Sequence, residues 1–246
     1  MRYKLLVPVT LAVVAFHCYA LNPIVQTIYN ADPAPVVHDG VCYLYTSYDE
    51  DVLVKNFFTM KDWRCFSSTD MVNWTDHGAV ASLRDFQWAD PKIIGWGGFE
   101  NGAWAVQCIE RGGKWYLYCP LQGRGIGVLV ADNPFGPFTD PIGRPLIGGL
   151  HDSIDPTVLI DDDGQAFLCW CIHDRDYISA CSVDFGDKGA ARFLASVASL
   201  TNGSAIELRV DGLLGELIGT LNAKSTGALE KWKTESCCVK SAKGVA

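Results

Sequence analysis

Apolar and polar residues alternate along much of the chain with the two-residue period of β-strands. The clearest case is "APVVHDGVCYLYT" at residues 34–46, where two runs rich in Val, Cys, Tyr and Leu flank the pair Asp39-Gly40. An Asp-Gly pair between such runs is typical of a tight β-hairpin turn. We therefore predict a hairpin here. Asp32 stands just ahead of it and either opens a turn or holds a carboxylate at the rim of a sheet.

The same plan of strand, glycine turn and strand recurs twice. "AWAVQCIERGGKWYLYC" begins at Ala103, "DPTVLIDDDGQAFLCW" begins at Asp155, and no amphipathic helix pattern separates them. Short strands repeated at intervals of about 50–70 residues are typical of a β-propeller, with one four-stranded blade per repeat. Residues 21–173 hold at most about three blades, whereas closed propellers have four to eight. We therefore predict an incomplete propeller, with a dimer in which two chains complete one another as a further alternative.

After about residue 173 the pattern changes. In "AIELRVD" at residues 205–211, Ile206, Leu208 and Val210 alternate with charged residues, and Gly and Asn turns recur nearby. Turns every 8–12 residues are typical of a β-sandwich. Residues 174–246 are too few for a complete eight-stranded jelly roll. The predicted fold is therefore all-β: an incomplete propeller over residues 21–173, followed by a partial sandwich over residues 174–246.

The first 20 residues have the pattern of a secretory signal peptide. Arg2 and Lys4 precede an apolar stretch, and the small residue Ala20 follows it. An apolar stretch of about 12 residues is too short to span a bilayer, so we predict cleavage after Ala20 rather than a membrane anchor. The mature protein is expected to be secreted, with no further membrane association.

Charge and composition limit the classes of partner and cofactor that we expect. The formal charge of −8 disfavours a nucleic-acid or anionic-membrane partner, whereas a neutral polysaccharide stays open. The ten cysteines match no zinc spacing and no His pair has ligand spacing, so neither a metal nor a cofactor is predicted. The cysteines are expected to be mostly buried, with one or two disulfides. His38, His77 and His151 are expected at turns or on the surface, without paired partners.

Several long stretches carry a family resemblance. "NPIVQTIYNADPAPVVHDG" (22–40), "GIGVLVADNPFGPFTD" (125–140) and "IDPTVLIDDDGQAFLCW" (154–170) resemble glycoside hydrolase family 43, particularly its arabinoxylan-debranching arabinofuranosidases. The resemblance implies a five-bladed propeller with the active site in its central funnel. It also implies hydrolysis of plant cell-wall arabinoxylan or a related hemicellulose by an inverting α-L-arabinofuranosidase. The alternatives of β-xylosidase and arabinanase activity stay open.

The resemblance also implies roles for individual residues. Asp32, in the "ADP" motif, would be the general base, and Asp155, in the "IDPT" motif, would orient the general acid and raise its pKa. Trp104 would shape the sugar pocket, whereas Trp115 and Trp170 are expected in the core. Inverting hydrolysis needs two carboxyl groups about 6.5–9.5 Å apart, and a third carboxylate near the acid keeps it protonated by like-charge repulsion.

The family's general acid, a glutamate in a later "EGPW"-like motif, has no counterpart in this sequence. Without an acid to protonate the leaving oxygen, general acid catalysis worth about 10²–10⁴-fold in rate would be lost. A catalytically dead polysaccharide-binding protein, or a degenerate truncated fusion, is therefore the alternative to an enzyme.

The C-terminal part of the chain, over residues 175–240, resembles carbohydrate-binding module family 6. The resemblance is carried by "RDYISACSVDFGDKGAARFLASVAS" and "STGALEKWKTESCCVK". Where that family often reads "TGGWQTW", this chain reads "TGALEKW". Leu229 thus replaces the aromatic residue that could stack on a sugar. Trp232 is expected to pack in the core.

Overall fold

The computed structural model describes residues 24–54, 57–89, 101–148, 153–162, 164–172, 175–180, 185, 187–212 and 214–242. Within these ranges the secondary structure consists of β-strands and one short 3-10 helix, η1 (Leu83–Asp85), which confirms the all-β prediction. None of the helices found there is long and apolar enough to cross a membrane. The predicted signal peptide lies outside the described residues.

The first sheet has the strand order β1-β2-β4-β5, with β3 added beside β2. Its strands are β1 (Tyr29–His38), β2 (Val41–Val54), β3 (Phe57–Thr59), β4 (Asp62–Ser68) and β5 (Thr75–Ser82). The predicted hairpin is confirmed, since β1 pairs antiparallel with β2 up to His38 and Val41. Asp39 and Gly40 have φ angles of 48° and 76°, which two-residue hairpin turns require and which Asp and Gly tolerate.

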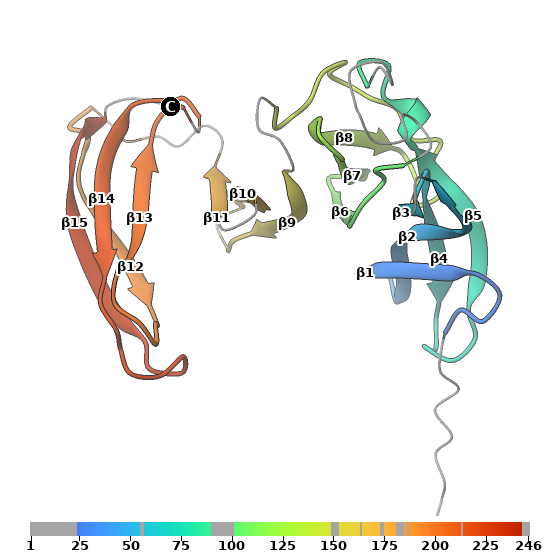
Figure 1. Cartoon of the computed structure of the whole chain (residues 1–246), viewed down its shortest axis with the longest axis horizontal. Coiled ribbons are helices and arrows are strands. Elements are labelled where there is room, and N and C mark those ends of the chain that lie inside the picture. The colour runs from blue at the N-terminus through green and yellow to red at the C-terminus, as the bar shows by residue number, and fades with distance from the viewer. Residues whose placement is uncertain are drawn as a thin grey trace, which may run out of the picture.

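The two later repeats form the cores of two further antiparallel sheets. One contains β6 (Gln107–Arg111), β7 (Lys114–Leu121) and β8 (Gly125–Ala131), and the other contains β9 (Ile154–Ile160), β10 (Ala166–Ile172) and β11 (Arg175–Ala180). Both predicted hairpins, β6–β7 and β9–β10, are confirmed. β11 lies beyond residue 173 and pairs with β10, so the third sheet extends past the predicted domain boundary. Figure 1 shows the three sheets following one another along the chain.

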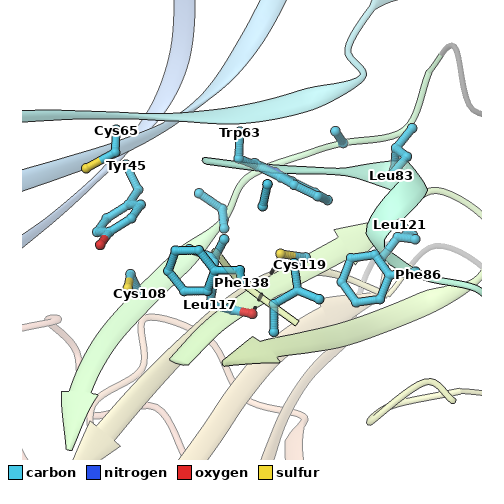
Figure 2. Packing of buried hydrophobic residues seen from close by; sticks show 14 of the residues in the cluster. Tyr45, Trp63, Cys65, Leu83, Phe86, Cys108, Leu117, Cys119, Leu121 and Phe138 are labelled. Carbon is cyan, nitrogen blue, oxygen red and sulfur yellow. Dashed lines mark hydrogen bonds between the residues drawn. The ribbon is translucent and has the colours of Figure 1, made fainter. Parts of the chain in front are cut away.

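The main hydrophobic core lies between the first and second sheets. Tyr45, Trp63 and Cys65 of the first sheet are fully buried, as are Leu117 and Cys119 of the second. Figure 2 shows these side chains gathered in one cluster, with Phe86 and Phe138 beside them. Burying a large apolar side chain stabilises a fold by about 1.5–3 kcal/mol, so this cluster holds the two sheets together.

The last four strands form two antiparallel pairs. β12 (Ala190–Val197) pairs with β15 (Lys233–Ala242), and β13 (Ser204–Arg209) pairs with β14 (Leu217–Ala223). Figure 1 shows them at the opposite end of the molecule from β1–β5. The predicted alternation is confirmed in β13, where Ile206 and Leu208 are less exposed than their neighbours.

The prediction that Trp232 packs in the core is wrong. Its side chain is 68% exposed, and Leu229 is 62% exposed. The buried positions among these strands are filled instead by Leu221 and Ala223 of β14. Trp232 lies just before β15 and is largely exposed.

Eight cysteines lie in the described part of the chain, and all eight are free, so the disulfide prediction is wrong for these residues. The prediction of burial is confirmed for Cys42, Cys65, Cys108 and Cys119. Burial raises the pKa of the Cys65 thiol to about 12 and that of the Cys108 thiol, likewise chiefly by burial, to about 12. These thiols therefore act as small apolar side chains.

Trp115 and Trp170 are each 4% exposed, which confirms their assignment to the core. Two histidines, in contrast, have partners that the sequence did not predict. His38 Nδ1 lies 3.4 Å from a Glu110 carboxylate oxygen. His77 Nε2 and Ser67 Oγ are 2.8 Å apart. His151 lies outside the described residues.

Candidate active site

A cavity of about 370 Å³ opens where the first sheet, the segment before β6 and the start of β9 meet. Its lining consists of Ala31, Asp32, Asp49, Met60, Trp104, Ala105 and Asp155. The structure thus brings together all three site residues predicted from the sequence, although they are separated by up to 123 positions (155 − 32). A cavity of this size lies in the usual range of small-ligand pockets.

A second cavity, of about 330 Å³, shares Asp32, Ala105 and Asp155 with the first. The remaining lining includes Pro33 and Pro156, the prolines that follow the two aspartates. The two aspartates therefore line both cavities, so their carboxylates are accessible to a ligand and to water.

Asp32 and Asp155 occupy equivalent positions in two different sheets. In β1, Asp32 and Pro33 lie opposite a single residue of β2, because the pairing register shifts between Ala31 and Ala34. In β9, Asp155 and Pro156 lie opposite Trp170 in the same way. Proline has no N–H to donate to a sheet, so an Asp-Pro pair inside a strand favours such a bulge.

Both bulges impose an unusual backbone on the aspartate. Asp32 has a φ angle of 55° and Asp155 one of 52°, in the left-handed region that non-glycine residues seldom adopt. Such a conformation costs about 1–3 kcal/mol and clusters at functional sites. Because a bulge redirects the side chain that it carries, the repeated geometry aims both carboxylates into the cavity.

A hydroxyl group from the neighbouring strand positions the Asp32 carboxylate. Ser47 Oγ donates to Asp32 Oδ2 over 2.7 Å and lies 3.2 Å from the carbonyl oxygen of Ala31. Ser47 is fully buried in β2, so its hydroxyl is held by the sheet. The second carboxylate oxygen of Asp32 is left for other partners.

A thiol contacts Asp155. Cys171 Sγ lies 3.4 Å from Asp155 Oδ2 and 3.9 Å from the carbonyl oxygen of Ile154. The two aspartates thus have different donors, an alcohol for Asp32 and a weaker thiol donor for Asp155.

Trp104 reaches the cavity from the segment between the first and second sheets. Its carbonyl oxygen accepts a 2.7 Å hydrogen bond from Trp63 Nε1, which fixes the backbone of Trp104 to the buried core. The neighbouring residue Ala103 donates its N–H to the carbonyl oxygen of Met60 over 3.0 Å. The indole and the Met60 side chain give the cavity an apolar wall beside its carboxylates.

Asp49 is a third carboxylate in this cavity, and the sequence analysis missed it. It lies in β2, two residues after Ser47, and pairs with Tyr29 of β1. Burial raises the pKa of its carboxyl group, an effect partly offset by a hydrogen bond from the backbone N–H of Thr59. Residues i and i+2 of a strand share a face, so Asp49 lies on the same face as Ser47, but this spacing alone does not single it out from Asp51.

No glutamate contributes to the described lining of either cavity. Within the described ranges, no group of three or more His, Cys, Asp or Glu side chains is arranged to hold a metal ion. The chemistry available from the described lining is therefore that of aspartate carboxylates beside an indole.

Carboxylates that converge from several strands on one small cavity define the kind of site that glycoside hydrolases use, since these enzymes act through paired Asp or Glu residues. The family model "Glycosyl hydrolases family 43" matches residues 20–204. The chain therefore belongs to glycosyl hydrolase family 43.

Two relatives have names that agree with this assignment. The arabinoxylan arabinofuranohydrolase of Bacillus subtilis is 36% identical over 179 residues, which cover 65% of this chain and 34% of that protein. The xylosidase/arabinosidase 43A of Humicola insolens is 34% identical, covering 60% of this chain and 45% of that protein. The chain thus spans roughly a third to under a half of these relatives.

Solved structures of the same family are also similar. The GH43_1 enzyme from Xanthomonas citri complexed with xylose is 37% identical over 59% of this chain and 40% of that chain, with a TM-score of 0.48. An arabinoxylan arabinofuranohydrolase from Bacillus subtilis in complex with cellotetraose covers 91% of this chain and 92% of that chain, with 19% identity and a TM-score of 0.48.

Proposed function

We propose that this protein is a secreted glycoside hydrolase that removes α-L-arabinofuranosyl branches from arabinoxylan by an inverting mechanism. The observation that carries the proposal is the convergence of Asp32, Asp155 and Trp104 on one cavity. Two relatives with arabinoxylan arabinofuranohydrolase activity in their names support the substrate class. Others named xylosidase/arabinosidase make β-xylosidase activity the neighbouring alternative.

In this proposal Asp32 is the general base. Its carboxylate would take a proton from a water molecule as that water attacks the anomeric carbon. The hydrogen bond from Ser47 would hold one carboxylate oxygen and leave the other directed at the water. Water can reach this position, because Asp32 lines both cavities.

Asp155 would act on the general acid rather than on the sugar. A carboxylate beside a second carboxyl group raises the pKa of that group, which keeps it protonated until it releases its proton to the leaving oxygen. The general acid itself is not assigned to a described residue. Trp104 would pack against the apolar face of the sugar ring.

The three sheets β1–β5, β6–β8 and β9–β11 would be successive blades of a five-bladed propeller, with the cavity facing its central funnel. Strands β12–β15 would be part of a β-sandwich of the carbohydrate-binding type. Residues 1–20 would direct secretion. These assignments rest on the repeated hairpins, the alternation in β13 and the basic-apolar pattern of the N-terminus.

The decisive experiment measures arabinose release from arabinoxylan by the purified protein and by Asp32→Asn. Asparagine keeps the shape of the side chain and tolerates a positive φ angle, but it cannot accept a proton. Asp39→Asn is the matched control, because Asp39 lies in the exposed turn of the same hairpin with a φ angle of 48°. Release that is lost only in Asp32→Asn supports the proposal, whereas release by neither folded wild type nor control overturns it.

A second candidate is a polysaccharide-binding protein without catalysis. It is favoured by the exposure of Trp232, which leaves an indole face available to stack on a sugar. Sedimentation with insoluble arabinoxylan tests it, comparing the wild type with Trp232→Ala and with Leu229→Ala as the control. Retention without arabinose release, lost in Trp232→Ala, supports binding alone.

A further inference from the structure

Asp49 has no role in the mechanism proposed above, yet it lies in the same cavity as Asp32, Trp104 and Asp155. Its position follows from the sheet. Ser47 and Asp49 are two residues apart in β2 and therefore share a face, and Ser47 contacts Asp32 from that face. A rise of about 3.3 Å per residue puts Asp49 roughly 6–7 Å along the strand from Ser47. That separation is comparable to the width of a sugar ring.

The electrostatic surroundings of Asp49 differ from those of its neighbour in the strand. Glu50 lies on the opposite face and forms a 3.0 Å ion pair with Lys61. Among the described residues no Lys, Arg or His lies within ion-pair distance of Asp49. Its carboxylate accepts a hydrogen bond from the backbone N–H of Thr59. A carboxylate has about four acceptor positions, so acceptor capacity remains for a ligand in the cavity that Asp49 lines.

We propose that Asp49 is a sugar-binding residue whose carboxylate accepts hydrogen bonds from hydroxyl groups of the terminal pentosyl unit and so fixes that ring over Asp32. The inference rests on the proposed function and deepens it, because it names the group that orients the substrate. Asp49 is partly buried, and the described residues offer it no cationic partner, so donors that reach its carboxylate would stabilise it, and sugar hydroxyls are such donors. Partial burial raises the pKa of Asp49, and the hydrogen bond from the backbone N–H of Thr59 offsets this only in part.

This role differs from that of Asp32. Asp32 faces both cavities and can hold a water molecule, whereas Asp49 lines only the larger one. The larger cavity also contains Trp104 and Met60, so an apolar wall lies beside the carboxylate. A pentose has both surfaces in one ring: C–H groups for the apolar wall and hydroxyl groups for Asp49.

The test measures binding of L-arabinose and of D-xylose to the full chain by NMR titration, which needs no turnover. Asp49→Asn is expected to weaken binding by about tenfold, the loss of one good charge-assisted hydrogen bond. Asparagine can still accept from Thr59 N–H, so the fold is retained. The matched control is Asp51→Asn, in the same strand but exposed and outside the cavity. Its affinity should equal that of the wild type.

The outcomes separate the two proposals. Equal affinities of wild type, Asp49→Asn and Asp51→Asn overturn the role of Asp49 and leave the proposed function standing. A folded wild type that binds neither pentose and releases no arabinose overturns both. If Asp49→Asn fails to fold, Asp49→Glu keeps the charge but displaces it. Weakened binding by Asp49→Glu then supports the role, and wild-type affinity overturns it.

Discussion

Ser47 and Asp32 are joined across the first hairpin by a hydrogen bond of 2.7 Å between Oγ and Oδ2. The donor is fully buried in a central strand, and the acceptor sits on a bulge with a positive φ angle. The rigid strand thus fixes a carboxylate that the bulge has turned out of the sheet. In the proposed mechanism Asp32 is the general base, so its support by Ser47 would determine how precisely it acts.

Removing the Ser47 hydroxyl should therefore impair the site. Ser47→Ala is expected to lower arabinose release by about tenfold, equivalent to about 1.4 kcal/mol, because the carboxylate loses its fixed orientation. The free energy of unfolding should fall by about 1 kcal/mol, as for a typical buried hydrogen bond. Ser67→Ala, which removes the contact with His77, should change stability and leave activity intact. Undiminished activity in Ser47→Ala would contradict the supporting role.

Trp63 connects the core to the cavity through its hydrogen bond to the carbonyl oxygen of Trp104. Trp63→Phe removes that donor and leaves a smaller ring. The free energy of unfolding should therefore fall by about 1–3 kcal/mol. Pentose binding should weaken as well, because Trp104 is no longer fixed. Trp115→Phe makes a similar reduction at a buried indole that contacts His38 and Tyr43. Trp115→Phe should lower stability, measured by chemical denaturation, and leave pentose binding, measured by NMR titration, unchanged.

Gly127 in β8 leaves no room for a side chain. A Cβ atom at this position would stand 2.3 Å from Cε1 of Phe86. Gly127→Ala should reduce stability in urea by about 1–3 kcal/mol, since overpacking forces neighbouring groups to shift. Shrinking the obstructing ring should relieve the strain, so Gly127→Ala in a Phe86→Leu background should cost less than in the wild type. Equal losses in both backgrounds would show that the close approach is unimportant.

The buried thiols predict a loss of stability at alkaline pH. Cys65 and Cys108 have pKa values of about 12 in the folded protein against 9.0 when exposed. Unfolded thiols ionise as the pH rises through 9, whereas the folded ones keep their protons, so stability is complete below pH 9 and declines above it. The limiting slope is about 1.4 kcal/mol per pH unit for each thiol. Denaturant unfolding under reducing conditions between pH 7.5 and 10.5 measures it, and Cys65→Ala should lessen the slope.

Local chemistry made several features predictable from the sequence. The pair Asp39-Gly40 encodes a turn because both residues tolerate positive φ angles, and the two-residue alternation around it encodes strands. Asp32, Asp155 and Trp104 were predictable because the motifs that carry them, "ADP", "IDPT" and "AWA", resemble motifs of the family. Each of these three residues lies in a short motif that can be recognised without knowing how the rest of the chain folds.

Other features depend on which distant segments come together. Asp49 joins the cavity only because β2, the segment of Trp104 and the start of β9 converge, and no local pattern distinguishes it from the exposed Asp51. Trp232 was expected in the core because tryptophan is strongly apolar, yet Leu221 and Ala223 fill the buried positions and leave it exposed. Sequence determined the turns, the strands and the paired aspartates, because those follow from backbone preferences and alternation. The tertiary structure alone decided the third carboxylate and the exposed indole, because burial is a property of the whole packing.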